Sequence, residues 1–424
     1  MPQVAVGILG RLPAPRRATL AAFRDAHGDS LDEGLALYFP APNSYTGEHV
    51  LELQGHGGAV VVDIVLKRLL ELGCRMARPG EFSERAFLNG KIDIAQAEAI
   101  ADLIEAGTAA AARAAVRSMQ GEFSARVTDL RARITGLRAY VEAAIDFPDE
   151  EIDFLSGEAL RERLAAVFGC IASITAAAHQ GALLREGFDV VIAGKPNAGK
   201  SSLLNRLAGG EVAIVTDLPG TTRDVLRQHV HLEGLPLNLV DTAGLRCAQD
   251  LIEAEGVRRA RNEIARADRV LYLVDAGSGG VDDDQKWAAE LAHLPPGIPV
   301  TLVFNKIDLT GMAPRLDAGL DPPRLFVSAR TGEGIALLRT HLQSCAGYVK
   351  SESGALAARR RHLDALDRAR RHVQSAADIL GTTRAFELFA EDLRLAQQAL
   401  GEITGEFTSD DLLSEIFGSF CIGK

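Results

Sequence analysis

The chain has 424 residues, of which 47% are hydrophobic and 24% are charged, and its formal net charge is −11. This length exceeds one ordinary core and predicts several domains, while this composition excludes a disordered chain. The negative charge argues against a general, salt-driven nucleic-acid binder, because it repels phosphate backbones.

Two further classes are disfavoured by residue patterns. We expect no apolar run to approach the roughly 18 uncharged residues of a membrane span, and the N-terminus does not read as a signal peptide. We therefore expect a cytoplasmic protein with no membrane partner. The five cysteines are scattered and never form a C-x-x-C pair, which argues against disulfides and a thiolate metal site.

The predicted elements change character along the chain. Short apolar runs between turn residues in residues 35–70 predict a small α+β unit. Residues 95–147 and about 158–184 are rich in Ala, Leu and Arg with apolar residues at helical spacing, which predicts long amphipathic helices.

A different pattern covers residues 190–345, where five apolar runs alternate with helical segments and predict a parallel α/β sheet. The runs are residues 190–193, 237–240, 270–274, 300–304 and 325–327. Helical sequence returns from residue 348 to about 400, and its basic stretch from Arg359 onward is interpreted as a solvated face. Since amphipathic helices need a shared partner, the segments on both sides are predicted to form one all-helical domain around the insertion.

Residues 194–201 read Gly-Lys-Pro-Asn-Ala-Gly-Lys-Ser, follow a predicted strand and open a predicted helix. This is the phosphate-binding loop pattern in its confirming context. Its backbone N–H groups would surround the phosphates, the catalytic Lys200 would bridge the terminal phosphates, and the Ser201 hydroxyl would bind Mg²⁺. The predicted nucleotide contacts of this loop are Asn197, Ala198, Gly199, Lys200, Ser201 and Ser202.

Two switch-like motifs follow in the order that GTPases use. The first motif is a mobile loop that ends in Thr221-Thr222, of which Thr222 is the better Mg²⁺ ligand. Asp241-Thr242-Ala243-Gly244 follows a strand, so Asp241 is predicted beside the Mg²⁺ and the Gly244 N–H near the terminal phosphate. The predicted nucleotide contacts in the first loop are Thr216, Asp217, Leu218, Pro219, Gly220, Thr221 and Thr222.

A base-reading motif completes the series. Asn305-Lys306-Ile307-Asp308 ends another strand, and the Asp308 carboxylate can accept from both the ring N–H and the amino group of guanine. Ser328, Ala329 and Arg330 fit the loop that contacts the guanine carbonyl. These motifs together predict GTP, and not ATP, as the nucleotide.

The water-activating group is not the usual one, because the apolar Leu245 follows Gly244. Glu253 is a carboxylate able to polarise a water, although spacing alone favours a solvated glutamate at a helix start. No arginine finger is evident in cis, so another cation must offset charge between the β- and γ-phosphates. Asn197 and the turn-rich residues 216–221 could hold one; the residues alone do not identify it.

Several long strings resemble the MnmE (TrmE) family of tRNA-modification GTPases, within the TrmE-Era-EngA-like group. They lie at residues 40–48, 51–58, 78–91, 142–148, 220–224 and 421–424, the last reading Cys-Ile-Gly-Lys. The resemblance implies a multidomain α/β protein whose P-loop GTPase domain is inserted in an all-helical domain, preceded by a small α+β folate-binding and dimerisation domain. The implied domains are residues 1–90, 91–186, 187–347 and 348–424.

The resemblance also assigns the ions and the catalytic water. It implies Mg²⁺ ligation by Ser201 and Thr222, and potassium-stimulated hydrolysis triggered by dimerisation of the GTPase domains. It makes Glu253 the water-orienting residue, which reverses the interpretation from spacing. The implied K⁺ ligands are Asn197, Thr216, Leu218 and Thr221.

The activity implied is modification of carbon 5 of the wobble uridine in the tRNA anticodon region to an aminomethyl or carboxymethylaminomethyl group. The implied partner is the FAD-dependent MnmG (GidA), bound to the homodimer in a heterotetramer. Glu52, Lys91 and Lys424 match positions lining a pocket for 5-formyl- or methylene-tetrahydrofolate. Cys421 could be a nucleophile or redox group, or an ordinary buried cysteine.

One departure and two alternatives remain open. The family opens with a strand and a T-P-P-G-R-G-like turn that residues 1–8 do not match, so we expect a shortened N-terminal domain, from a start codon assigned inside a longer frame or from truncation. The first alternative function is a regulatory GTP switch like the ribosome-assembly factors Era and EngA. The second is a truncated chain that hydrolyses GTP and modifies nothing.

Overall fold

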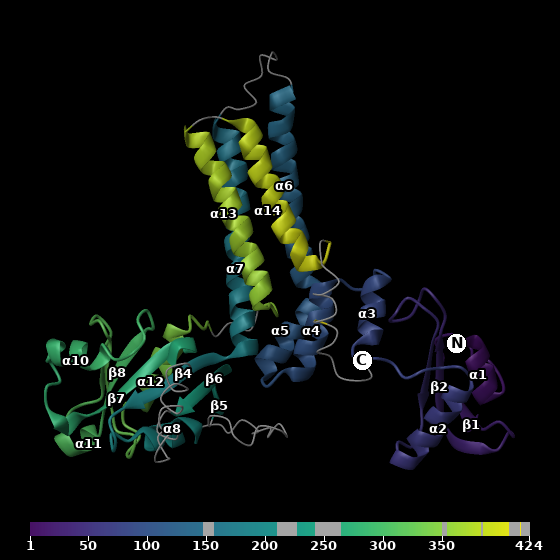
Figure 1. The fold of residues 1–424 in the computed structure, drawn as a ribbon, viewed down its shortest axis with the longest axis horizontal. Helices are drawn as coiled ribbons and strands as arrows, with labels where there is room; N and C mark the ends of the chain where they lie inside the picture. Colours follow the sequence, from purple (N-terminus) through teal and green to yellow (C-terminus); the bar gives the residue numbers. More distant parts are fainter. Residues whose placement is uncertain are drawn as a thin grey trace, which may run out of the picture. The chain divides into compact units, whose positions relative to one another are not determined.

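The computed structural model describes residues 1–146, 157–209, 227–241, 264–349, 354–382, 385–406 and 416 (Figure 1). The chain divides into two compact units. One comprises Met1–Ala101, Ser118–Ala172 and Asp364–Lys424, and the other comprises Asp102–Arg117 and Ser173–Leu363. The helices α4 (Ile94–Glu105) and α7 (Gly157–Glu186) each have residues in both units.

The N-terminal part of the first unit is a small α+β fold, as predicted. Its elements are α1 (Pro2–Leu9), β1 (Thr19–Arg24), β2 (Ser30–Phe39), β3 (Val50–Gln54), α2 (Ala59–Glu71) and α3 (Glu81–Leu88). The three strands form an antiparallel sheet in the order β1-β2-β3. Ile8, Phe23 and Ala36 are buried together beneath it, which anchors α1 to the sheet.

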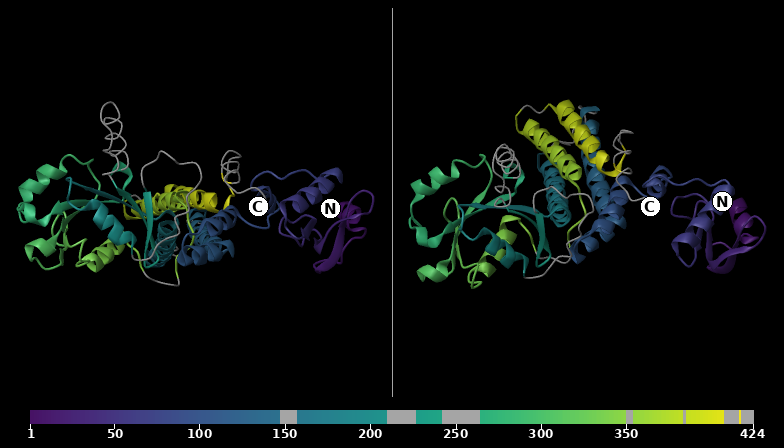
Figure 2. Two further views of the ribbon diagram at one scale, coloured as in Figure 1. Left: turned by 90° about the horizontal axis from the view of Figure 1, so that it is seen from below. Right: turned by 60° about the horizontal axis from the view of Figure 1, so that its bottom comes forward.

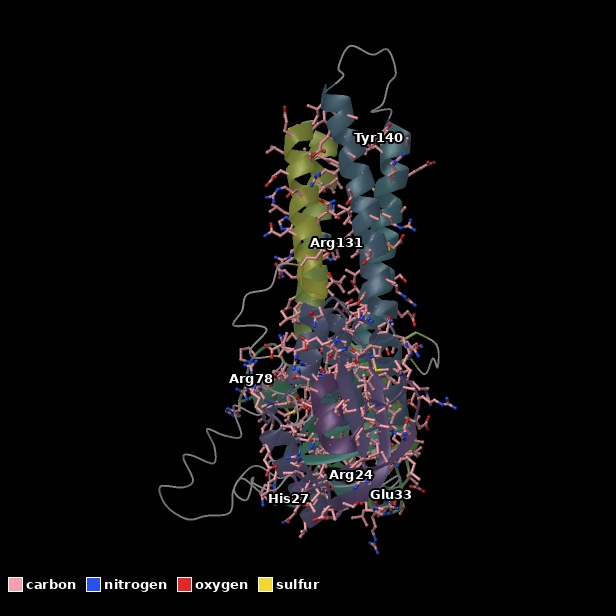
Figure 3. The ribbon with its side chains drawn as sticks, turned by 90° about the vertical axis from the view of Figure 1, so that its right-hand side faces the viewer. Arg24, His27, Glu33, Arg78, Arg131 and Tyr140 are labelled. Carbon is pink, nitrogen blue, oxygen red and sulfur yellow. The ribbon has the colours of Figure 1, made fainter. Side chains whose placement is uncertain are left out.

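The helical part of the same unit joins segments far apart in the sequence. It contains α6 (Glu122–Asp146), α13 (Arg360–Thr382) and α14 (Phe386–Thr404) with parts of α4 and α7; α5 (Ala109–Met119) lies mostly in the second unit. Arg138 on α6 donates to Gln397 on α14 at 2.8 Å, and the Arg163 guanidinium lies 4.7 Å from the Tyr140 ring centroid. Figure 3 labels Arg131 and Tyr140 on α6. Helices that precede and follow the insertion therefore pack together, as predicted.

The helix α6 shows why these segments pair. Its buried apolar side chains recur every three or four residues and so form one stripe along the helix. They are Phe123, Val127, Leu130, Ile134, Leu137 and Val141. The α6 helix therefore packs through one apolar face, and the Arg131–Glu406 ion pair adds to this contact.

The expectation that no apolar run reaches the length of a membrane span is wrong for α7. Residues 159–186 meet that test by length and composition, with a mean hydropathy of 1.5. However, 44% of the apolar window is buried inside the protein, and its buried residues follow helical spacing. A core helix passes the same test, so this one helix of the described chain is weak evidence for a span.

The second unit contains a seven-stranded sheet in the order β5-β6-β4-β7-β8-β10-β9 (Figures 1 and 2). Its strands are β4 (Phe188–Gly194), β5 (Arg227–Leu232), β6 (Leu235–Asp241), β7 (Arg269–Asp275), β8 (Val300–Asn305), β9 (Arg315–Asp317) and β10 (Arg324–Val327). The five predicted runs are the parallel strands. The prediction of a parallel sheet is incomplete, because β5 and β9 pair antiparallel at its two edges.

Successive side chains of the buried strands point to opposite faces of this sheet, and helices pack on both faces. Val190 and Ile192 pack with α8 (Lys200–Ala208) and α12 (Ile335–Cys345). On the opposite face, Trp287 of α10 (Asp284–Leu291) packs against Phe304, beside η2 (Ala276–Ser278) and α11 (Ile307–Thr310). The carboxyl ends of the parallel strands stay uncovered by these contacts, where such folds bind ligands.

Candidate functional site

The predicted phosphate loop connects β4 to α8 and has the backbone that it requires. Gly194 has φ 136° and Gly199 has φ 97°, and Asn197 also has a positive φ of 62°. A Cβ on Gly194 would lie 2.3 Å from the Leu273 carbonyl oxygen, and one on Gly199 would lie 2.3 Å from Asn305 Nδ2. Both glycines are therefore needed for conformation and for space.

Lys200 lies at the start of α8 with its ammonium turned back over this loop. Its Nζ donates to the carbonyl oxygens of Gly194 at 3.0 Å and Lys195 at 2.8 Å, and the residue is 9% exposed. Ser201 and Ser202 are exposed in the first turn of α8. The loop thus presents the N-terminus of α8, the fixed ammonium of Lys200 and the exposed Ser201. Together these groups suit a phosphate chain with a bound divalent metal ion.

A buried amide joins this loop to the base-reading loops. Asn305 is 2% exposed; its Nδ2 donates to the Ala198 carbonyl at 2.8 Å, and its Oδ1 accepts from the Ala329 N–H at 2.9 Å. Sequence reasoning assigned Asn305 to nucleotide contact and missed this bridging role. The position of an amide immediately after a buried strand is the one signal that could have indicated it.

Asp308 and Lys306 are each fixed by a neighbour. Ser328 Oγ donates to Asp308 Oδ1 at 2.6 Å, which leaves the second carboxylate oxygen able to accept from a base. Lys306 has φ 68°, and its Nζ lies 2.7 Å from Asp275 Oδ2. The hydrogen bond from Lys306, followed by that from the Gly277 N–H, lowers the pKa of Asp275. Asp275 is a site residue that the sequence analysis missed.

The last loop is held from α8. Arg206 donates through Nε to the Ala329 carbonyl at 3.0 Å and also bonds the Arg330 carbonyl. Arg330 itself is exposed. The structure therefore brings the phosphate loop, residues 305–308 and residues 328–330 into one site at the carboxyl ends of β4, β8 and β10.

Asp241 is placed by its strand. It ends β6, which pairs parallel with β4 in a register that sets Ile192 opposite Asp241, so its backbone lies beside the phosphate loop. The Ser201 hydroxyl is an oxygen ligand of the kind that Mg²⁺ prefers. The remaining predicted contacts lie outside the described residues: Thr216, Asp217, Leu218, Pro219, Gly220, Thr221, Thr222, Thr242, Ala243, Gly244 and Glu253.

No group of three or more His, Cys, Asp or Glu side chains suitable for a metal occurs among the residues described. The described cysteines, Cys74, Cys170 and Cys345, are free thiols. Cys421 and Lys424 lie outside the described residues.

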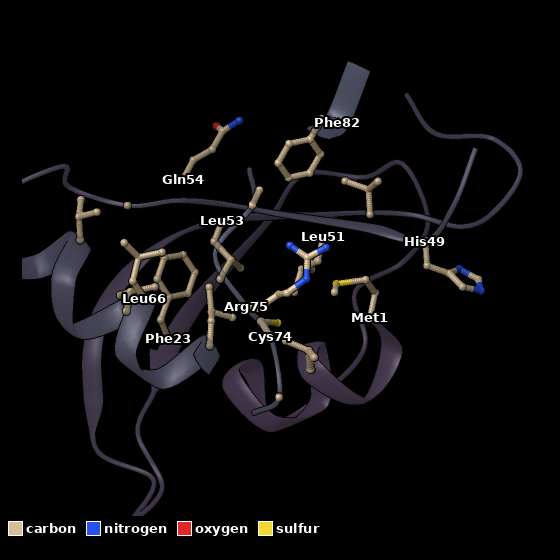
Figure 4. A pocket seen from close by; sticks show the side chains of 18 of the residues that line it. Met1, Phe23, His49, Leu51, Leu53, Gln54, Leu66, Cys74, Arg75 and Phe82 are labelled. Carbon is tan, nitrogen blue, oxygen red and sulfur yellow. The ribbon is translucent and has the colours of Figure 1, made fainter. Parts of the chain in front are cut away.

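Away from the phosphate loop, a cavity of about 940 Å³ lies in the N-terminal α+β fold (Figure 4). Its wall combines apolar side chains of β3 and α2, including Leu51, Leu53 and Leu66, with the polar residues Arg75 and Glu81. Such a mostly apolar wall with a few convergent charges is typical of small-molecule sites.

Of the predicted folate residues, two are described. Glu52 is exposed on β3 between Leu51 and Leu53, and it is not among the residues that line this cavity. Lys91 is exposed, and its Nζ donates to the Pro42 carbonyl at 3.1 Å. Lys91 is likewise absent from the residues that line the cavity of Figure 4.

We predict that Glu81→Gln weakens the N-terminal fold near α3. The Glu81 side chain is 6% exposed and accepts from Arg75 at 2.5 and 2.8 Å and from the Arg78 N–H at 2.8 Å, which lowers its pKa to about 2. Because the folded pKa is depressed, the stabilisation is complete above pH 4.5 and is lost as pH falls toward 2. At pH 7 the loss should be about 1.5–3 kcal/mol.

Hydrogen exchange of the α3 amides at pH 7 and pH 3 measures this local stability. The difference in protection between wild type and variant should be largest at pH 7 and clearly smaller at pH 3, where part of the stabilisation has been lost. Glu84→Gln is the control, because Glu84 pairs with Arg78 but is 29% exposed, so its loss should be smaller. An equal difference at both pH values would contradict the assignment.

The chain matches known proteins over its whole length. Sequence models of the MnmE helical domain and of the GTP-binding protein TrmE N-terminus match residues 94–421 and 3–91. The tRNA modification GTPase MnmE of Pectobacterium carotovorum subsp. carotovorum (strain PC1) is 57% identical over 424 residues, which is 100% of this chain and 93% of that protein. MnmE of Yersinia pseudotuberculosis serotype IB (strain PB1/+) matches with the same identity and coverage.

Among solved structures, the G domain of the T. maritima FeoB iron transporter is 28% identical and covers 38% of this chain and 98% of its own, with a TM-score of 0.28. Aquifex aeolicus Era bound to GDP and AlF4⁻ is 26% identical and covers 43% of this chain and 66% of its own, with a TM-score of 0.28.

Proposed function

The chain belongs to the MnmE family of tRNA modification GTPases, and from this premise we propose that it modifies carbon 5 of the tRNA wobble uridine. The product would carry an aminomethyl or carboxymethylaminomethyl group, made with an FAD-dependent partner protein, MnmG, and a one-carbon unit from a tetrahydrofolate. The observation that best supports this proposal is the 57% identity with a tRNA modification GTPase MnmE across all 424 residues.

GTP hydrolysis is the activity for which the described residues give a direct physical account. Lys200 is held over the phosphate loop, and the bridging amide of Asn305 fixes the distance from that loop to the base-reading loop. Preorganised cations and N–H donors of this kind act on charge that develops during phosphoryl transfer. Asp308, oriented by Ser328, would select guanine.

For the ions, we assign Mg²⁺ to Ser201 and Thr222, with Asp241 beside them. Mg²⁺ would neutralise charge on the β- and γ-phosphates. A potassium ion held by Asn197 and by the loop residues Thr216, Leu218 and Thr221 would supply the positive charge that an arginine finger supplies elsewhere. Glu253 would orient the attacking water, directly or through a second water.

Potassium dependence is expected from this assignment. Asn197 is exposed and its positive φ of 62° turns its backbone inside the phosphate loop. GTP turnover should be faster in potassium than in sodium at matched ionic strength, and Asn197→Ala should remove the difference while sparing nucleotide binding. Equal turnover in both salts by the unchanged chain would exclude the role of Asn197.

For the one-carbon carrier, we assign Glu52, Lys91 and Lys424, which pair a carboxylate for the pterin with cations for the glutamate tail. The N-terminal fold would also form the homodimer, and dimerisation of the GTPase domains would accelerate hydrolysis. The proposed location is the cytoplasm, where tRNA and the partner protein are available.

The test is mass spectrometry of wobble-uridine nucleosides in tRNA from cells that lack their own family member. Complementation with this chain should restore the carbon-5 modification, and complementation with Lys200→Ala should not. A soluble chain that restores nothing while altering ribosome profiles would replace this proposal with a regulatory GTP switch. A soluble chain that hydrolyses GTP and changes neither would leave hydrolysis as its sole activity.

A further inference from the structure

Two arginines from opposite ends of the GTPase insertion share one buried carboxylate. Asp102 lies near the end of α4 with its side chain 5% exposed. Its Oδ1 accepts from Arg185 Nε at 2.8 Å and from Arg359 Nη2 at 2.9 Å. Arg185 lies in the last turn of α7 before β4, and Arg359 immediately precedes α13. The carboxylate therefore joins the passage entering the GTPase fold to the passage leaving it.

Further contacts bind the same two passages along α7. The Gln180 side chain donates to the Gly347 carbonyl at 2.6 Å and accepts from the Val349 N–H at 3.1 Å. One amide thus satisfies two backbone groups of the outgoing chain. Such two-sided bonding fixes the backbone more firmly than a single hydrogen bond does.

The outgoing chain then packs directly on the α7 backbone. The Leu356 N–H donates to the Ala177 carbonyl at 3.1 Å, and a Cβ on Gly181 would lie 1.7 Å from the Leu356 carbonyl oxygen. No side chain fits at Gly181, so the glycine permits the close approach. The basic stretch was predicted as a solvated face, which is wrong for Arg359, because its side chain is 18% exposed and pairs with Asp102.

We infer that Asp102 is a positioning residue that couples the GTPase fold to α4 and α7. Both arginines donate to the same oxygen, Oδ1, of a buried carboxylate. Removing one partner of such a pair is costly, because it leaves a desolvated charge. Both helices continue beyond the unit that contains the GTPase fold. We call Asp102 with Arg185 and Arg359 the clamp. When the GTPase fold moves during the nucleotide cycle, the clamp passes this movement into α4 and α7, whereas a loose linker would absorb it.

The experiment is hydrogen exchange on the full chain with Asp102→Asn, in the presence of GDP or a non-hydrolysable GTP analogue. In the unchanged chain, exchange of residues 102–117 and 173–186 should differ between the two nucleotides. In the variant that difference should shrink about fivefold or more, while GTP turnover stays within about twofold. A purely structural role would raise exchange equally with both nucleotides.

Glu402→Gln is the matched control, because it removes an Arg–carboxylate pair, with Arg368, that lies away from the insertion. It should leave the nucleotide-dependent difference intact. Should Asp102→Asn not fold, Arg359→Gln tests the same clamp with Asp102 still paired to Arg185. Retention of the full difference in a folded Asp102→Asn or Arg359→Gln chain would overturn the inference, as would its loss in Glu402→Gln.

The exchange measurement uses no tRNA, so it can fail or succeed independently of the proposed modification. The inference rests on that proposal in one further readout only. In a modification assay, Asp102→Asn should yield fewer modified uridines per GTP hydrolysed than the unchanged chain, and an unchanged ratio would contradict coupling.

Discussion

Asp308→Asn is expected to weaken GTP binding by about 10²–10⁴-fold and to give the chain a preference for xanthosine triphosphate. In the proposed site the Asp308 carboxylate would accept two hydrogen bonds from guanine, since Oδ1 keeps a second lone pair beside the bond from Ser328. Charge-assisted hydrogen bonds contribute about 1.5–3 kcal/mol each. An asparagine presents an N–H₂ group where guanine presents a donor, whereas xanthine presents a carbonyl oxygen there. Competition between fluorescent GTP and xanthosine triphosphate measures both changes.

Two further variants separate this effect from loss of structure. Ser328→Ala removes the 2.6 Å bond that orients Asp308 but keeps the carboxylate, so GTP binding should weaken about tenfold with no change of base preference. Asp317→Asn makes the same chemical change at a partly exposed position on β9 and should alter neither property. Weakened binding of both nucleotides by Asp308→Asn, with no inversion, would refute the base-reading role.

The central strands and the phosphate loop could be predicted from the sequence because their signals are local. Residues 194–201 combine a fixed glycine spacing with a preceding apolar run, and the structure gives Gly194 and Gly199 the positive φ that this spacing requires. The same applies to Asp308, whose motif directly follows β8. In these places the chemistry and the backbone constraint lie within a few consecutive residues.

The edge strands could not be predicted in this way. β5 reads Arg-Gln-His-Val-His-Leu and has only two apolar residues, and β9 has three residues. Edge strands bury one face or less, so they lack the continuous apolar run that marked the parallel strands. Their antiparallel pairing with β6 and β10 is nevertheless local in sequence. Only Glu233 and Gly234, both with positive φ, separate β5 from β6, and this two-residue turn is a hairpin signal that the sequence analysis missed.

Side-chain partnerships across the chain were equally out of reach. Asn305 bonds Ala198, 107 positions earlier, and Arg359 bonds Asp102, 257 positions earlier. The residue types fit many roles, and only the fold selects one. Arg359 illustrates the cost of reading charge locally, since its run of arginines resembles an ordinary exposed helix face.

Lys200→Ala is expected to lower the turnover number for GTP hydrolysis by about 10²–10³-fold, the loss typical of removing one preorganised donor at a developing charge. Lys195→Ala is the matched control, because it deletes the same side chain from the same loop. Lys195 is 68% exposed and pairs with Glu290 on the surface, whereas the Lys200 ammonium is held by the carbonyls of Gly194 and Lys195.

The control keeps the Lys195 carbonyl, so the support for the Lys200 ammonium survives, and turnover should change by about twofold or less. Single-turnover hydrolysis at saturating GTP compares the two variants without interference from nucleotide affinity. If the two variants lost activity equally, the loop's conformation rather than the Lys200 charge would be what hydrolysis requires. A large loss confined to Lys200→Ala would show that the positive charge of Lys200 acts on the phosphate that is transferred.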